Sequence, residues 1–390
     1  MNRQEFGQFV REARIKAQLT LREAARRMEF SASYLSRVES GDETVSPNMI
    51  VAMAETYGMK VEELTSRAPM KAAGVYGQTM RNSADLRALY RLGAVLSPAD
   101  IEEVLRMFLH DKQGLEGEAL EDALRKLRAE LPRLRSGSEG LFAAEVKPRQ
   151  LSKDRIAKIA DAFLRKHGLT ESTYVPPTPL EHLIDREPDI RLRFDELDTT
   201  PTSEPYVLGK TRWALDGKKE IIINSALDNP DTPNNEYRLL FTLGHELFHA
   251  IEHLPLMQGQ PQAYFHTVND RFRPESPHQT RAQRSLEHWR TTSAPRPLVT
   301  AEDWREWQSQ RFSASVLMPE WALRQELRER EIDLPVRTEE DPRDVALDLA
   351  TSAVFQESFF EDPLHQRFRV SGLAMAVRLL SLGFVTGEHA

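Results

Sequence analysis

Residues 239–253 read LLFTLGHELFHAIEH, an apolar segment interrupted by three histidines and two glutamates. Its apolar residues recur at helical spacing, so the segment is predicted to form a buried helix. His245 and His249 are four residues apart and therefore share one face of that helix, one turn from each other. Imidazoles on a buried helix need a partner, because an unsatisfied polar group in apolar surroundings is costly.

The two histidines and the intervening glutamate form an H-E-x-x-H pattern, which suits a divalent metal ion. Two imidazoles at this spacing hold one Zn²⁺ at roughly 2.0–2.1 Å each. Glu246 lies next to the open position of the metal, where it takes a proton from bound water whose pKa the metal lowers to about 7. The pattern alone is short enough to arise by chance, so its flanking sequence decides the matter.

The flanking segments support a metal site. Before the helix, KEIIIN at 219–224 predicts a strand, and metallopeptidases commonly offer the edge of such a strand to an extended peptide. After the helix, residues 302–318 predict a second helix that ends before Pro319. Three acidic residues of this second helix are each able to supply a carboxylate ligand: Glu302, Asp303 and Glu306.

Residues 155–390 resemble the ImmA/IrrE family of zinc metallopeptidases. The resemblance is carried by IIINS, RLLFTLGHELFHAIEH, EWQSQRFSASVLMP and the closing LHQRFRVSGLAMAVRLLSLGFV. It implies a zincin-like domain that binds Zn²⁺ through His245, His249 and a glutamate of the later helix. Glu246 is implied to be the catalytic base. We assign the third ligand to Glu306.

One departure from the family bears on that assignment. Many relatives carry a second glutamate two residues after Glu306, and this chain has Gln308 there. A neutral amide is a poor zinc ligand, so a ligand position at Gln308 would lower the metal affinity and leave the domain inactive. His253, one turn further along the first helix, is predicted to be a partly exposed histidine; the alternative is that it supports the metal ligands from behind.

The beginning of the chain predicts a compact set of short helices. Thr20 and Ser31 are predicted to cap two consecutive helices separated by a short turn. Small residues at Ala24 and Ala25 let the two helices cross closely. The second helix places its larger apolar residues inward and leaves these residues on its outer side: Ala32, Ser33, Tyr34, Ser36 and Arg37.

Residues 3–65 resemble the Cro/C1-type (XRE) helix-turn-helix family. The segments that carry the resemblance include SRVESG and SPNMIVAMAETYGMKVEEL. The family's common glutamine early in the first of the two helices is absent, since Leu21 follows Thr20. The resemblance implies that operator DNA is bound by a homodimer, with Arg22 near phosphates. It implies base-edge contacts from four residues of the second helix: Ser33, Tyr34, Ser36 and Arg37.

Charge and composition narrow the class of protein. The net charge is −8 over 390 residues, yet residues 1–37 hold eight Lys or Arg against four Glu, a local excess of +4. Such an excess on an acidic chain indicates a phosphate-facing surface. The chain has no cysteine, which excludes disulfides and thiolate-bound zinc. No segment is apolar enough to span a bilayer, so we expect a cytoplasmic protein without a membrane partner.

The predicted fold class is α+β and mostly helical, in three parts. Residues 1–68 are predicted to be a five-helix DNA-binding domain. Residues 69–150 are predicted to be a helical connector, or a dimerisation or sensor segment, with a linker. Residues 151–390 are predicted to be the peptidase domain, with a small β-sheet and a helical, helix-turn-helix-like end over about 341–390. Within these parts, the helices of 81–135 have no assigned role, and 254–300 is predicted to be a long surface insertion.

Two functions follow from these predictions. In the first, a DNA-binding regulator carries a zinc endopeptidase that cleaves a regulatory protein, such as a repressor, and thereby switches transcription. In the alternative, the second half is a non-proteolytic sensor or interaction module. The identity of the cleaved protein and of the operator is not encoded in any motif of the sequence.

Overall fold

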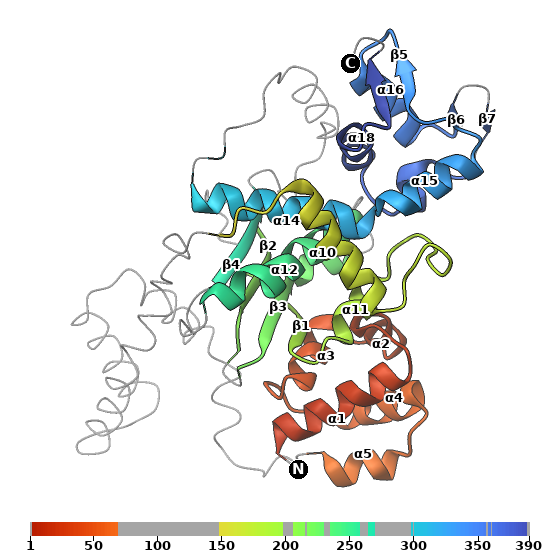
Figure 1. Cartoon of the computed structure of the whole chain (residues 1–390). Coiled ribbons are helices and arrows are strands. Elements are labelled where there is room, and N and C mark those ends of the chain that lie inside the picture. Colours follow the sequence, from red (N-terminus) through yellow and green to blue (C-terminus); the bar gives the residue numbers. More distant parts are fainter. Residues whose placement is uncertain are drawn as a thin grey trace. The chain divides into compact units, whose positions relative to one another are not determined.

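The computed structural model contains a helical N-terminal domain and a larger part with a small sheet (Figure 1). The residues that the structure describes are 2–68, 148–197, 206–214, 217–229, 235–257, 264–269, 298, 300–355, 358–359 and 361–387. Met1–Ala68 and Ala143–Ala390 form one compact unit. The helices predicted at 81–135 belong to a second unit, Pro69–Phe142, which lies outside the described residues.

The N-terminal domain consists of short capped helices, as the sequence predicts. They are α1 (Arg3–Lys16), α2 (Leu21–Arg27), α3 (Ala32–Glu39), α4 (Pro47–Tyr57) and α5 (Val61–Arg67). Thr20 accepts from the backbone N–H of Glu23, whose side chain in turn accepts from the N–H of Thr20. Ser31 caps α3 in the same position. These caps satisfy N–H groups that have no partner inside the helix, and so fix where α2 and α3 begin.

A four-stranded sheet underlies the second part, in the order β1-β3-β2-β4. Its strands are β1 (Ile190–Asp195), β2 (Tyr206–Trp213), β3 (Lys219–Asn224) and β4 (Tyr264–Asn269). β1 runs parallel to β3, and the other pairs are antiparallel. The strand predicted at 219–224 is confirmed as β3. β4 forms within residues 254–300, the stretch predicted to be a long surface insertion, so part of that stretch adds a strand to the sheet.

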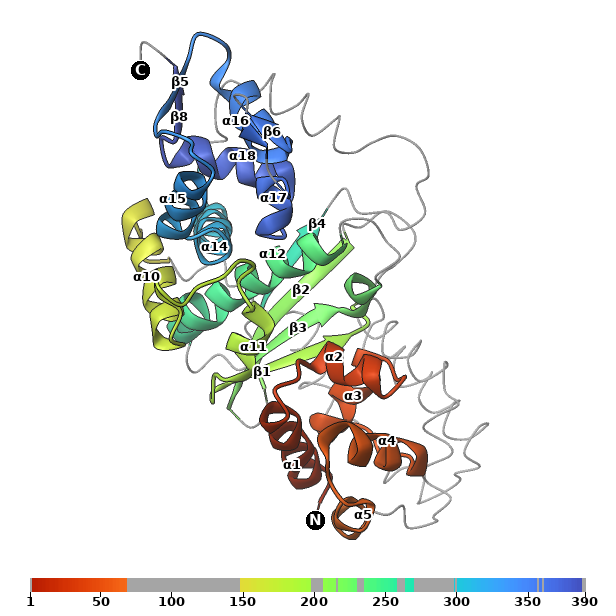
Figure 2. The same ribbon diagram turned by 90° about the vertical axis from the view of Figure 1, so that its right-hand side faces the viewer.

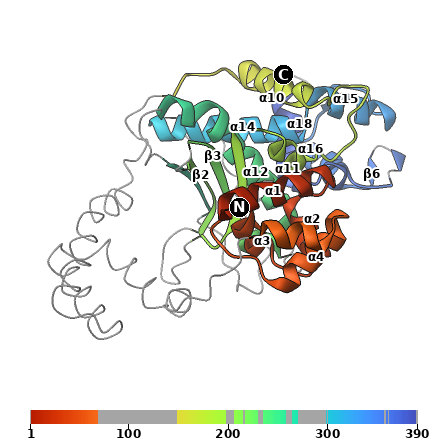
Figure 3. The same ribbon diagram turned by 90° about the horizontal axis from the view of Figure 1, so that it is seen from below.

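Helices pack on one face of this sheet (Figure 2). The H-E-x-x-H segment lies in α12 (Asn235–Phe248), which packs against β2 and β3 and continues as a π-helical turn, η3 (His249–His253). α14 (Ala301–Leu317) packs along α12, and α10 (Lys153–Lys166) lies beside α14 (Figure 3). π-helical turns are rare and occur frequently at functional sites.

The remaining elements are short. Those between α10 and α12 are α11 (Leu180–Asp185) and the 3₁₀ turn η2 (Ser225–Asp228), and the 3₁₀ turn η4 (Leu254–Met257) follows η3. The C-terminal elements are α15 (Glu320–Glu329), β5 (Val336–Thr338), α16 (Pro342–Thr351), β6 (Val354–Phe355), β7 (Ser358–Phe359), α17 (Leu364–Arg367), α18 (Gly372–Ser381) and β8 (Val385–Gly387). No helix in the described part of the chain has the length and apolar character to cross a bilayer.

Candidate functional site

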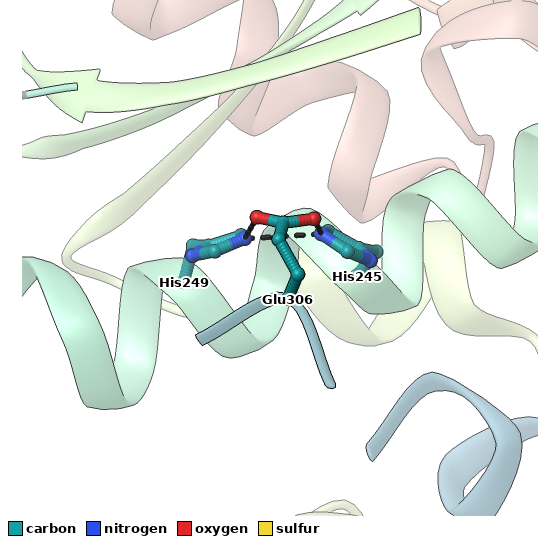
Figure 4. Close-up of side chains that lie close together, drawn as sticks. All are labelled: His245, His249 and Glu306. Atoms are coloured by element: carbon teal, nitrogen blue, oxygen red, sulfur yellow. Dashed lines mark hydrogen bonds and ion pairs between the residues drawn. The ribbon is translucent and has the colours of Figure 1, made fainter. Parts of the chain in front are cut away.

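Three side chains from α12, η3 and α14 converge on one point (Figure 4). The Nε2 atoms of His245 and His249 lie 3.0 Å apart. The carboxylate of Glu306 faces both rings, with one oxygen 3.2 Å from His245 Nε2 and the other 3.4 Å from His249 Nε2. For a tetrahedral ion with bonds of about 2.0–2.1 Å, neighbouring ligand atoms are separated by about 3.4 Å. The three distances therefore approach those around a single small ion.

The donor set also suits a metal in its chemistry. Two imidazoles and one carboxylate are a set that zinc takes in catalytic sites. His245 and His249 are buried, whereas the Glu306 side chain is 34% exposed and forms the side of the cluster that faces solvent. Burial raises the pKa of the Glu306 carboxyl, but its close contacts with the imidazoles of His245 and His249 outweigh the effect of burial, so that the pKa falls far below its usual range. Glu306 is thus an anion at neutral pH, as a ligand must be.

The other two candidate ligands point elsewhere. The Asp303 carboxylate accepts from the N–H and hydroxyl of Thr300 at the start of α14. Glu302 is exposed in the first turn. Among the described residues, the cluster of possible ligands consists of His245, His249 and Glu306.

A close helix crossing brings Glu306 to the histidines. A side chain at Gly244 would begin 2.6 Å from Ser313 Oγ, so α14 approaches α12 only because this position is glycine. Ser313 donates to the carbonyl of Phe241 on α12, 2.8 Å away. One turn nearer the cluster, the rings of Phe248 and Phe312 pack with centroids 4.8 Å apart.

Glu246 is fully buried between α12 and the sheet. Its Oε2 accepts a hydrogen bond from Thr211 Oγ1 at 2.7 Å. Gly209, two residues earlier on β2 and thus on the same face of the sheet, leaves the space that the carboxylate fills. A Cβ at Gly209 would lie 2.7 Å from Glu246 Cγ and 2.8 Å from Oε1. No sequence pattern singled out Gly209 or Thr211, because their role depends on strand pairing.

A chain of hydrogen bonds behind the cluster sets the orientation of His249. Gln308 Nε2 lies 2.7 Å from the carbonyl oxygen of Arg149, which can only accept, so this atom is the amide nitrogen. Gln308 Oε1 consequently accepts from Nε2–H of His253, at 3.1 Å. His253 Nδ1 then carries the lone pair that faces His249 Nδ1 at 3.0 Å. His249 therefore keeps its proton on Nδ1 and presents the Nε2 lone pair to the cluster.

One prediction about these residues needs correction. His253 is 2% exposed and not partly exposed, since α14 covers the far end of η3. Burial lowers the pKa of His253 well below its ordinary value and keeps the ring neutral. Gln308 does not stand at a ligand position; its amide holds His253. A hydrogen-bonded outer partner of this kind fixes the ring orientation of a metal-binding histidine.

The prediction that the strand at 219–224 offers its edge to a peptide also needs correction. β3 is central, because it pairs with β1 on one side and with β2 on the other. β4 pairs with β2 and lies at the end of the sheet formed by the described strands. β4 also packs against α12.

The predicted DNA-contact residues of α3 are less exposed than expected. Ser33 and Ser36 are buried, so the prediction that they lie on an open outer face is wrong; the same holds for Ala32. Tyr34 is half-buried, and its hydroxyl donates to the carbonyl of Thr44. The cause lies partly outside the N-terminal domain, because α3 packs against β1 and the N–H of Phe194 donates to Ser36 Oγ.

The arginines of this domain also have partners beyond it. Arg37 donates to Ser33 Oγ and lies 3.6 Å from Asp195 on β1. Arg22 donates to Glu181 on α11 at 2.9 Å. Burial alone would lower the pKa of Arg22, but Glu181 raises it above its usual value. Both arginines thus face carboxylates of the second part.

Comparison with known proteins identifies the N-terminal domain. The family described as "Helix-turn-helix domain" matches residues 5–66. The chain is 32% identical over 104 residues to the HTH-type transcriptional regulator DdrOP3 of Deinococcus deserti. The aligned stretch makes up 27% of this chain and 81% of that regulator. The chain therefore belongs to the family of helix-turn-helix transcriptional regulators, and α2 and α3 are its helix-turn-helix pair, with α3 in the place of the recognition helix.

Proposed function

We propose that this chain is a DNA-binding transcriptional regulator whose second half is a zinc-dependent endopeptidase that cleaves a regulatory protein. The DNA-binding half rests on the helix-turn-helix family and on the basic residues of 1–37. The peptidase half rests on one observation, the convergence of His245, His249 and Glu306 at 3.0–3.4 Å beside the buried Glu246.

The residues around the cluster have separate roles in the proposed hydrolysis of a peptide bond. His245, His249 and Glu306 would hold the ion, which supplies an acidified water and an electrophile for the scissile carbonyl. Glu246 takes the proton of the attacking water on Oε1, while Oε2 stays bound to Thr211. The same carboxyl then returns the proton to the leaving amine. The exposed side of Glu306 leaves access for a substrate from solvent.

The substrate of such a site is an extended segment of protein. An added strand takes main-chain hydrogen bonds from a sheet edge, and β4 is the edge strand that packs against the histidine-bearing helix. We propose β4 as the docking strand. Cleavage of a repressor or partner protein bound in this way would couple proteolysis to transcription.

The test uses the full chain and two variants with different expectations. Glu246→Gln keeps all three ligands, so it should bind zinc stoichiometrically yet yield no cleavage. Glu306→Gln should lose most of the bound zinc as well as activity. Zinc is measured by elemental analysis. Cleavage is measured by the new N-termini that the zinc-loaded protein produces in a proteome-derived peptide library and in the products of neighbouring genes.

Each other outcome has a definite meaning. Stoichiometric zinc in the wild type without any zinc-dependent new N-terminus would replace the peptidase by a zinc-binding sensor or interaction module. Equal zinc content in the wild type and in Glu306→Gln would contradict the ligand assignment itself. Cleavage that persists in Glu246→Gln would remove that residue from the mechanism.

A further inference from the structure

A set of carboxylates from the second part of the chain contacts the helix-turn-helix domain. We call it the acidic docking face, and its members come from α11, β1 and η2: Glu181, Asp185, Asp195 and Asp228. Each of the four pairs with an arginine of α1, α2 or α3. The arginines are Arg11, Arg14, Arg22, Arg26 and Arg37.

Arg14 is at the centre of this contact and is fully buried. Its guanidinium donates to both oxygens of Glu39 within its own domain and to both oxygens of Asp185 on α11, the latter at 2.7 and 3.2 Å. Burial disfavours the charged form, but the two carboxylates outweigh it and raise the pKa of Arg14 well above its usual value. Arg11 adds a hydrogen bond to the carbonyl of Ile190 at the start of β1.

The contact extends over α2 and α3. Glu181 accepts from both the side chain and the backbone N–H of Arg22, and Asp228 lies 3.4 Å from Arg26. On α3, Ser36 is 1% exposed and accepts from a backbone N–H of β1. Arg193 of β1 reaches back to Asp42, just beyond α3, at 2.8 Å. A recognition helix covered in this way by β1 cannot enter a major groove.

The same arginines are suited to phosphate. Arginine binds carboxylate and phosphate through the same planar set of donors, and phosphate contacts are what position a helix-turn-helix domain on DNA. Residues 1–37 carry an excess of +4, whereas the whole chain carries −8, so the counter-charge is supplied by the rest of the molecule. The carboxylates of the acidic docking face therefore occupy the side of α2 and α3 that would otherwise approach the phosphates of a DNA backbone.

We propose that the acidic docking face and duplex DNA are alternative partners of the same side of the helix-turn-helix domain. With the domain docked, five of its arginines are paired with carboxylates of the acidic docking face and α3 is covered. DNA binding then requires the domain to leave the acidic docking face. The proposal rests on the DNA-binding half of the proposed function and is independent of the peptidase half. Because the apparent affinity for DNA scales with the undocked fraction, weakening the docking should strengthen DNA binding.

The test compares full-length proteins in binding to a short fluorescein-labelled random-sequence duplex at low salt, by fluorescence anisotropy. Two interface variants are used: Glu181→Gln with Asp185→Asn, and Asp195→Asn with Asp228→Asn. The second pair has partly exposed side chains, so it keeps the test valid if the first fails to fold. Each folded variant should bind the duplex at least about tenfold more tightly than the wild type.

A matched control separates docking from net charge. Glu339→Gln with Glu340→Gln removes two exposed carboxylates away from the acidic docking face, and should change the affinity far less. Interface variants that fold but bind no more tightly than this control would overturn the proposal. If none of the proteins binds the duplex, the DNA-binding function fails as well, which is a separate and recognisable result.

A cross-link tests the geometry directly, since the chain has no cysteine of its own. Arg37→Cys with Asp195→Cys places two thiols across the contact between α3 and β1, to be joined by a short bismaleimide. The cross-linked protein should lose the duplex binding that the same variant has before cross-linking. Undiminished binding after complete cross-linking would also overturn the proposal.

Discussion

Replacement of His253 by phenylalanine tests the chain of hydrogen bonds behind the cluster of His245, His249 and Glu306. His253 is 2% exposed and joins His249 Nδ1 at 3.0 Å to Gln308 Oε1 at 3.1 Å. Phenylalanine fills a similar volume beside Phe248, whose ring packs edge-to-face on His253 with centroids 5.1 Å apart. The substitution removes both hydrogen bonds while keeping the packing.

Two magnitudes follow. Each buried group that loses its partner costs about 1–3 kcal/mol, so we expect a total loss of folding stability of about 2–6 kcal/mol. Loss of an outer-shell partner typically lowers metal affinity by about 10–100-fold, which is about 1.4–2.8 kcal/mol, because His249 no longer has its ring and tautomer fixed. His253→Gln, whose amide both accepts and donates, should recover part of each loss.

The assay is competition for Zn²⁺ with a chromophoric chelator, combined with urea unfolding of the metal-free proteins. His365→Phe is the matched control. His365 is a half-buried histidine on α17, and its replacement removes one hydrogen bond, to the carbonyl of Ala350. It should leave zinc affinity unchanged. A folded His253→Phe protein with the zinc affinity of the wild type would refute the argument that His253 orients His249.

Three further outcomes are expected. Glu306→Gln should reduce bound zinc to well below stoichiometric amounts, whereas Glu302→Gln should retain it; elemental analysis after dialysis distinguishes the two. Gly209→Ala should abolish cleavage and destabilise the fold, because its Cβ would meet the Glu246 side chain at 2.7–2.8 Å; peptide-library cleavage and thermal unfolding measure both effects. Lastly, the pKa of His253 is lower in the folded protein than its ordinary value of 6.5, which applies after unfolding. Between these two pKa values, unfolding is accompanied by proton uptake at His253. The contribution of neutral His253 to the stability of the metal-free protein is therefore complete above pH 6.5 and is lost as the pH falls below 6.5. The loss from this residue approaches about 1.4 kcal/mol per pH unit, and urea unfolding at about pH 7.5 and about pH 5.5 should show a smaller difference in His253→Gln.

Local order was predictable wherever neighbouring residues along the chain determine it. The caps at Thr20 and Ser31 and the helices over 239–248 and 302–317 follow from hydrogen-bonding side chains and from apolar periodicity. Those signals lie within a few residues of the element that they specify. The spacing of His245 and His249 on one helical face belongs to the same class of inference.

Other features depend on segments that meet only in three dimensions. The sequence left Glu302, Asp303 and Glu306 as possible partners of the histidines, and the crossing of α14 over α12 brings Glu306 to them. Gln308 looked like a weakened ligand position, but its contact with Arg149, 159 residues away, makes it the support of His253.

A capped helix-turn-helix pair and two histidines on one helical face can be derived from the order of residues, because helical period and capping act over one or two turns. The cover of α3 by β1 and the sharing of Arg14 between Glu39 and Asp185 depend on how distant segments pack together. The distribution of charged residues along the chain indicates that a surface is basic, but it does not indicate which groups pair with that surface. That partner is set by packing between segments more than a hundred residues apart, and at Arg14 burial strengthens the ion pair with Asp185 by excluding water.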